Sequence, residues 1–330
     1  MSLKNNPILK SSTIRVGLTI GDPSGIGPAI TLKALKLLKG KANITVIGDS
    51  FVLAKTAKAL RIGFMPGKFI DLNNIRRKDF VPGRVGFLGG KASLEYLDTA
   101  VELLKNKELD CLVTCPISKE AINLAGSKFS GHTEYLAGKF GREDLVMMLI
   151  NNKLKFSLVT RHIPLKDVSA SLTRAKLENN IMNTVNGLRD LFLIPRPRIV
   201  VCGMNPHASD NGVIGTEELK VIKPAIASLR RRLKGVCLKG PFPADIAISE
   251  AANGIFDCVV ALYHDQALIP LKLTNFDSGI NLTLGLPFVR TSPLHGTAFD
   301  LAEKPSLANP NSLVAAIKLA IKCSLSQKRA

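Results

Sequence analysis

The sequence predicts an α/β protein of two lobes, each built on a mostly parallel sheet covered by helices. Two observations support this prediction. Short runs rich in β-branched residues alternate with segments of helical spacing, which is typical of parallel βαβ units. The chain also has 330 residues, more than a single small domain needs. We place one lobe at residues 1–130, completed by a C-terminal helix at 305–330, and the other at residues 131–304.

The first lobe is expected to begin with a buried strand at 13–20, which runs into a glycine-rich turn. A helix at 29–40 follows, because its apolar residues have helical spacing, Pro28 precedes it and Gly40 closes it. The other elements predicted here are a strand at 44–48, a helix at 51–60, a helix at 93–107 and a strand at 110–115.

The second lobe is expected to contain a hairpin. Apolar runs at 145–150 and 155–160 flank the pair Asn151-Asn152, and this spacing suits an antiparallel turn. The other elements predicted in this lobe are a helix at 174–192, a strand at 198–204, a helix at 216–233 and a strand at 257–262. The final helix, predicted at 311–323, belongs to the first lobe.

The composition is that of a globular protein. Apolar residues make up 46% and charged residues 22%, which excludes disorder as the main state. No apolar run approaches the roughly 18 residues that span a bilayer, and the first residues lack the apolar core of a signal peptide. The six cysteines form no C-x-x-C pair and are expected to be reduced. We therefore expect a cytoplasmic protein without membrane partners.

The charge is strongly positive. There are 45 Lys and Arg against 26 Asp and Glu, a formal net charge of +19, which favours an anionic partner. The cations are scattered and aromatic residues are 5% with no Trp, so few side chains could stack on nucleic-acid bases. We therefore prefer to interpret the charge as a solvated basic surface. A phosphorylated small molecule is the mildest functional interpretation of the same signal, and an RNA-binding protein is the alternative from another class.

Histidines are the most informative side chains, because all five lie in short polar patches punctuated by Gly or Pro. His162, His207 and His264 each follow a predicted strand, and ligands bind at the carboxyl ends of strands in α/β sheets. Three converging imidazoles would form an open metal site, although their spacing matches no compact metal motif. Such a site would also suit a metal-dependent hydrolase or lyase. Asp265, beside His264, could orient a ligand or bind a proton.

Two further segments carry polar groups in suggestive order. The turn GDPSGIGP (21–28) could present backbone N–H groups to an anion, or could serve only to pack a helix on its strand. It is neither a dinucleotide fingerprint nor a P-loop. In the stretch 263–298, Lys272, Asn281 and Arg290 recur at intervals of nine, and these are groups that grip a phosphate or carboxylate.

Several motifs in order resemble those of the 4-hydroxythreonine-4-phosphate dehydrogenase family of pyridoxal phosphate biosynthesis. They are GLTIGDPSGIGP, GHTEYLAG, NPHASDNGVIGTEE, GPFPAD, YHDQALIPLK and GINLTLGLPFVRTSPLHGTAFDLA. The resemblance implies NAD-dependent oxidation of 4-phosphohydroxy-L-threonine to 2-amino-3-oxo-4-(phosphooxy)butanoate, which decarboxylates to 3-amino-2-oxopropyl phosphate. It also implies a fold similar to isocitrate and isopropylmalate dehydrogenases, and a homodimer whose active sites lie at the subunit interface.

The resemblance also implies roles for individual residues. The ligands of a divalent metal (zinc, magnesium or cobalt) would be His162, His207 and His264, contributed by two subunits. The substrate-binding residues would be His132, Thr133, Lys272, Asn281 and Arg290, and further residues lining the site would be Lys119, Asp245 and Asp265. Either Asp245 or Asp265 could take the proton of the substrate hydroxyl.

Some positions depart from the family pattern without removing a metal ligand or a phosphate-binding cation. These positions are Ala29, Ser209, Asp210, Ile246, Ala267 and Leu294. They leave open a paralogue that oxidises D-threonate 4-phosphate or D-erythronate 4-phosphate with the same groups.

Overall fold

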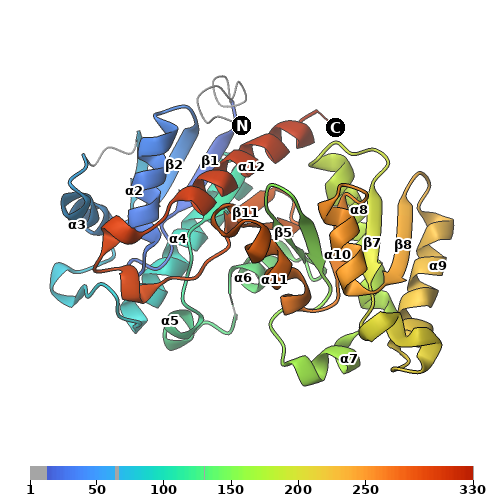
Figure 1. Cartoon of the computed structure of the whole chain (residues 1–330). Coiled ribbons are helices and arrows are strands. Elements are labelled where there is room, and N and C mark those ends of the chain that lie inside the picture. The colour runs from blue at the N-terminus through green and yellow to red at the C-terminus, as the bar shows by residue number, and fades with distance from the viewer. Residues whose placement is uncertain (1–12, 64–66, 130, 330) are drawn as a thin grey trace. The chain divides into compact units, whose positions relative to one another are not determined.

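The structure is a computed structural model, and it describes residues 13–63, 67–129 and 131–329. The chain folds into two compact units (Figure 1). Unit 1 contains the described residues up to Glu143 together with Leu286–Arg329, and unit 2 contains Asp144–Gly285. Each unit combines a sheet with helices, so the predicted fold class is confirmed.

Unit 1 has a parallel sheet. Its strand order is β3-β2-β1-β4-β11, and every neighbouring pair is parallel. The strands are β1 (Arg15–Thr19), β2 (Asn43–Gly48), β3 (Lys68–Asp71), β4 (Cys111–Thr114) and β11 (Val289–Pro293). All side chains of β4 are buried, as expected for a central strand covered on both faces. The carboxyl ends of the five strands therefore lie at one edge.

Helices connect the strands of unit 1. They are α2 (Gly27–Leu38), α3 (Ser50–Leu60), α4 (Phe87–Lys105), α5 (Lys119–Leu124), α6 (His132–Phe140) and α12 (Asn311–Gln327). Asp49 caps α3, because its carboxylate accepts a hydrogen bond from Val52 N at 3.1 Å. Helix α12 packs beside β11, where Thr291 Oγ1 donates to Ala316 O at 2.9 Å (Figure 1).

Unit 2 has a mixed sheet with the strand order β10-β5-β6-β9-β7-β8. The strands are β5 (Val146–Ile150), β6 (Lys155–Leu158), β7 (Arg198–Cys202), β8 (Cys237–Phe242), β9 (Cys258–Ala261) and β10 (Ile280–Leu284). Strands β5 and β6 form the predicted antiparallel hairpin, and β10 is antiparallel to β5. The run β6-β9-β7-β8 is parallel.

Helices also connect the strands of unit 2. They are α7 (Val168–Ser171), α8 (Arg174–Asp190), a π-helical turn (Glu218–Ile222), α9 (Lys223–Arg232), α10 (Ala244–Ala252) and α11 (His264–Thr274). The helix expected at 216–233 therefore begins with a π-helical turn. Turns of this kind are rare and are frequently found at functional sites.

The limits of the units differ from the predicted ones. Helix α6 and strand β11 were expected in the second lobe, and both belong to unit 1. Tyr135 of α6 donates its hydroxyl to Asp98 Oδ1 on α4 at 2.5 Å, and Phe140 packs on Phe288 with ring centroids 4.9 Å apart. Strand β11 pairs with β4. These contacts move the limits to Glu143 and Leu286.

Candidate active site

A buried guanidinium is the main charged feature of unit 1. Arg290 lies on β11 and is only 2% exposed. One terminal NH2 group donates to Thr114 Oγ1 on the neighbouring strand β4 at 2.6 Å. Burial lowers the pKa of Arg290 to about 10, while the negative charge of Glu134 opposes this fall. The side chain therefore remains charged at neutral pH.

Helix α6 brings two predicted substrate residues beside this cation. His132 is its first residue, and Thr133, the next, is buried. His132 is half-buried, and its Nε2 is buried and forms no hydrogen bond with any residue that the structure describes. Burial and the charge of Arg290 hold the pKa of His132 well below its ordinary value. The imidazole is thus neutral, and its Nε2 is available to a ligand.

Lys119 adds a second cation near the start of α6. It is the first residue of α5 and its side chain is exposed. A Cβ placed on Gly131 would lie 4.0 Å from Lys119 Cε and 3.6 Å from Glu134 Oε2. Two cations, a neutral imidazole and the first turn of a helix therefore occur together in unit 1. This combination suits a phosphate or carboxylate group.

The glycine-rich turn at 21–28 has a packing role. Gly21 has φ +71°, and a Cβ there would lie 2.3 Å from Pro116 O. At Gly27 a Cβ would lie 2.0 Å from Ile20 O. Both glycines thus let α2 approach β1 and the end of β4 more closely than any larger residue allows. Of the two interpretations of this turn, anion binding or helix packing, the structure supports helix packing.

The same turn contains a buried carboxyl group that the sequence analysis did not identify. Asp22 is 1% exposed, its Oδ1 accepts from Ser24 N at 2.9 Å, and its Oδ2 has no hydrogen-bond partner among the described residues. Burial raises the pKa of Asp22 to about 6, which the bond from Ser24 partly offsets. Nothing in the sequence around Asp22 signals its burial.

His295 is the fifth histidine of the polar patches. It follows β11, its Nδ1 lies 3.0 Å from Gly296 O, and its Nε2 is buried without a hydrogen bond to the described residues. Burial lowers its pKa below the ordinary value. Two neutral imidazoles, those of His132 and His295, thus occur in unit 1.

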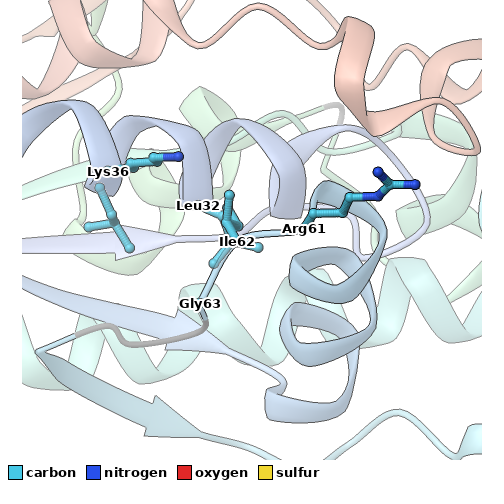
Figure 2. Close-up of a pocket in the computed structure, with 6 residues that line it drawn as sticks. Leu32, Lys36, Arg61, Ile62 and Gly63 are labelled. Atoms are coloured by element: carbon cyan, nitrogen blue, oxygen red, sulfur yellow. The ribbon is translucent and has the colours of Figure 1, made fainter.

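Unit 1 also contains two cavities. One, of about 240 Å³, lies beside the glycine-rich turn and is lined in part by Gly25, Ala29, Lys55, Phe80 and Glu303. The other, of about 380 Å³, lies between α2 and the end of α3 (Figure 2). It is lined by Leu32, Leu35, Lys36, Arg61, Ile62 and Gly63, none of which is a predicted site residue.

Two of the predicted metal ligands lie together in unit 2. His162 follows β6 and His264 follows β9, and these strands are parallel neighbours, so their carboxyl ends meet. The ring centroids are 5.6 Å apart. His264 Nδ1 lies 2.6 Å from Asp265 Oδ1, which leaves its Nε2 for a metal ion. Two of the three expected metal ligands, His162 and His264, are therefore close together.

His207 does not join this pair. It follows β7, the other parallel neighbour of β9, yet no group of three or more His, Cys, Asp or Glu that could hold a metal occurs within residues 13–63, 67–129 and 131–329. Its imidazole is exposed. One chain thus brings together two of the three histidines.

The segment that carries His207 has an unusual backbone. His207, Ala208, Ser209, Asp210 and Asn211 are all left-handed, with φ between 43° and 71°. This conformation costs about 1–2 kcal/mol for each residue with a side chain. Runs of this kind persist only where the surrounding structure fixes them, and they concentrate at functional sites.

The remaining predicted residues of unit 2 lie on separate elements. Asp245 is in the first turn of α10 and is exposed, and Lys272 is in the last turn of α11 and is exposed. Asn281 lies on β10, half-buried, and its Oδ1 makes no hydrogen bond with a described residue. Asp265 contacts His264, as given above. Asp245, Lys272 and Asn281 thus come from three different elements, α10, α11 and β10.

Comparison with known proteins decides the family. The model of the family "Pyridoxal phosphate biosynthetic protein PdxA" matches residues 34–320. The chain belongs to this family. A PdxA relative from Desulforapulum autotrophicum, named 4-hydroxythreonine-4-phosphate dehydrogenase, is 41% identical over 92% of this chain and 94% of its own. A relative of the same name from Sulfurihydrogenibium sp. is 40% identical, over 93% and 98% of the two chains.

Solved structures agree with this assignment. The crystal structure of 4-hydroxythreonine-4-phosphate dehydrogenase from Klebsiella pneumoniae superposes with a TM-score of 0.84 at 36% identity, covering 94% of this chain and all of that one. The predicted resemblance to the PdxA family is thus confirmed, and membership supports an oxidoreductase. Within the described part of the chain, no helix is both long and apolar enough to cross a membrane.

Proposed function

We propose that this PdxA-family chain oxidises 4-phosphohydroxy-L-threonine with NAD and a divalent metal, in the cytoplasm. When bound, NAD would supply the acceptor for the C3 hydride. The hydroxyl proton would pass to a carboxylate of the protein, and the product would be 2-amino-3-oxo-4-(phosphooxy)butanoate. This β-keto acid then loses CO2 to give 3-amino-2-oxopropyl phosphate. The observation that carries the proposal is the buried Arg290 beside neutral His132, with Lys119 near the start of the same helix α6, in a chain whose relatives bear the name of this reaction.

The unit 1 cluster is assigned to an anionic group of the substrate. A buried guanidinium forms stronger hydrogen bonds to phosphate than an exposed one, because water does not compete. The neutral His132 can donate or accept at Nε2, and Thr133 adds a hydroxyl in the first turn of α6. These contacts lie away from the reacting carbon, so they supply binding energy that holds it in place. Lys272 and Asn281 of unit 2 are assigned to the other polar groups.

The metal is assigned to His162, His264 and a His207 from a second subunit, so that the active form is a homodimer. Two facts support this assignment. His207 does not join the other two histidines within one described chain. Large apolar side chains are also exposed next to the three histidine segments, with Leu165 73%, Val213 84% and Leu273 82% exposed. When bound, a divalent ion at this site lowers the pKa of the substrate hydroxyl.

The two candidate bases are given different roles. Asp265 Oδ1 already pairs with His264 Nδ1, so Asp265 is assigned to orienting that imidazole. Asp245 in the first turn of α10 is assigned to receiving the hydroxyl proton. The 240 Å³ cavity beside the glycine-rich turn, with Phe80 and Lys55 in its wall, is assigned to part of NAD.

One experiment tests the proposal. The purified protein with zinc or magnesium is offered 4-phosphohydroxy-L-threonine and D-threonate 4-phosphate in parallel, and NADH formation is recorded. Turnover of the amino acid at higher kcat/KM supports the proposed reaction. A higher kcat/KM for the sugar acid would instead assign the chain to the paralogue reaction. Turnover of either substrate without NAD would contradict the oxidation itself and support a hydrolase or lyase.

A further inference from the structure

A hydrogen-bond frame joins the three segments of unit 2 that carry His162, His207 and His264. Its members are Glu217, Glu218 and Gln266, none of which has a role in the reaction proposed above. All three bind backbone or side-chain groups within or beside residues 203–205, just before the left-handed turn. The inference below rests on the proposed metal site.

Glu218 is the centre of the frame. It is fully buried, with an exposed fraction of 0%, in the π-helical turn before α9. Its Oε1 accepts from Met204 N at 2.7 Å and from Asn205 N at 2.8 Å, and its Oε2 accepts from Asn205 Nδ2 at 2.8 Å. One buried carboxylate thus satisfies three N–H donors at the end of β7. A charged acceptor binds N–H groups more strongly than a neutral one.

Glu217 holds the same asparagine from the solvent side. Its Oε2 accepts the other Nδ2 hydrogen of Asn205 at 2.8 Å, and its Oε1 accepts from Ser169 Oγ at 2.5 Å. Ser169 lies on α7, in the segment that follows His162. These hydrogen bonds hold the pKa of Glu217 at about 2, so the carboxylate is ionised throughout the neutral range. The His162 and His207 segments are therefore tied together.

Gln266 completes the frame from α11, the helix that begins with His264. Its Nε2 donates to Gly203 O at 2.9 Å, and its Oε1 accepts from Leu262 N at 2.7 Å. Gly203 N donates to Phe242 O at 2.7 Å. The polar backbone groups of Gly203 and the N–H groups of Met204 and Asn205 are thus all bonded. These hydrogen bonds fix the backbone immediately before the left-handed turn.

We propose that Glu218 is a positioning residue for His207. By fixing residues 203–205, it holds the left-handed turn in the conformation in which the imidazole can bind the metal ion. Without the carboxylate, the three N–H donors lose their charged acceptor and the turn relaxes to right-handed backbone. The effect of Glu218 on metal binding then passes through His207, and this distinguishes positioning from a general contribution to folding.

Glu218→Gln is the main test variant. The glutamine amide oxygen can still accept the two backbone N–H groups, but its NH2 faces Asn205 Nδ2 in place of an acceptor. The matched control is Glu250→Gln on α10, a half-buried glutamate outside the frame. Should Glu218→Gln fail to fold, Glu217→Ala takes its place as the test variant, because it removes the hydrogen bond that holds Asn205 from the half-exposed side.

Two measurements are made, on the purified full-length protein. Hydrogen exchange of residues 203–212 without metal should become faster in the variant and stay unchanged in the control. The affinity for Zn²⁺, measured by competition with a chelator, should fall about 10–100-fold. In a His207→Ala background, the same Glu218→Gln change should reduce Zn²⁺ affinity no further, because the group on which it acts is already lost.

The outcomes separate this inference from the proposed function. If His207→Ala lowers Zn²⁺ affinity but Glu218→Gln does not, the positioning role is wrong and the metal assignment stands. If Glu218→Gln lowers affinity equally with and without His207, its effect is a general one and the positioning role is again wrong. If His207→Ala leaves Zn²⁺ affinity unchanged, the metal assignment fails and the role of Glu218 with it.

Discussion

Replacing Arg290 should make the fold more stable while weakening substrate binding. Arg290 is a charged group in the interior of unit 1, and one of its hydrogen bonds goes to the hydroxyl of Thr114. The paired change Arg290→Met with Thr114→Val removes the charge together with that hydroxyl. Both new side chains are apolar and close in size to the originals. The core thus keeps its volume without a buried polar atom at either position.

The pKa of Arg290 gives the size of the effect. A fall from 12.5 to about 10 corresponds to about 3 kcal/mol by which folding is opposed at neutral pH. Because the folded pKa is depressed, this cost is fully present below pH 10 and is relieved only as the pH rises through 10. The double variant should therefore gain about 1–3 kcal/mol in free energy of unfolding. Thr114→Val alone should lose about 1–3 kcal/mol, since it leaves the buried guanidinium without that partner.

Urea unfolding at pH 7.5, followed by circular dichroism, measures these differences for the wild type, both single variants and the double variant. Calorimetry of substrate binding gives the other half of the prediction, a loss of about 10–100-fold in affinity, as expected for a lost charge-assisted hydrogen bond. A double variant less stable than the wild type would refute the reasoning. So would unchanged affinity, because Arg290 would then be a structural cation.

Three further outcomes are expected. Asp22→Asn should raise the free energy of unfolding by about 3 kcal/mol at pH 8. The pKa of the Asp22 carboxyl is about 6 in the folded protein and 3.8 in the unfolded chain, so the wild-type fold loses stability as the pH rises from 4 to 6. Urea unfolding of both proteins from pH 4 to 8 should show that the gain of the variant vanishes at pH 4, and a gain independent of pH would contradict this reasoning. His132 should stay neutral, so its NMR signals should not titrate between pH 8 and 6, and a titration midpoint near 6.5 would be inconsistent with its burial. Asp98→Ala should free Tyr135 and Lys139, speed hydrogen exchange in α6 and raise the KM for substrate, with destabilisation of about 1–2 kcal/mol; Asp79→Ala in the turn after β3 is the control.

Strands rich in β-branched residues could be predicted from the sequence, and others could not. The run at 145–150 is apolar throughout, the run at 155–160 contains Phe156, Leu158 and Val159, and both form strands. Strand β8 was missed, because its segment CLKGPF contains glycine and proline and only one of its side chains is buried. Helix α11 was missed because Pro270 lies inside it and no side chain caps its first turn.

The site shows the same contrast between local and distant causes. The sequence identifies Arg290 as a cation, but its burial depends on pairing with β4, whose Thr114 is 176 positions away. Likewise, the sequence places three histidines after strands, and the strand order brings two of those ends together. The roles of Glu217 and Glu218 arise at the start of a π-helical turn, which no spacing in the sequence indicates.

The discontinuous course of unit 1 bears on the order in which the chain can fold during synthesis. Unit 2 is one continuous segment, Asp144–Gly285, so it can complete its sheet as soon as β10 has left the ribosome. At that stage β4 has been synthesised but its neighbour β11 has not, so one edge of β4 is unpaired. The side of the core that α12 covers in the complete chain is also still exposed. The N-terminal unit, although made first, must therefore finish last. Nascent chains that stall before residue 289 would expose the open edge of β4, a strand whose side chains are all buried in the finished fold, to the chaperones of the cell.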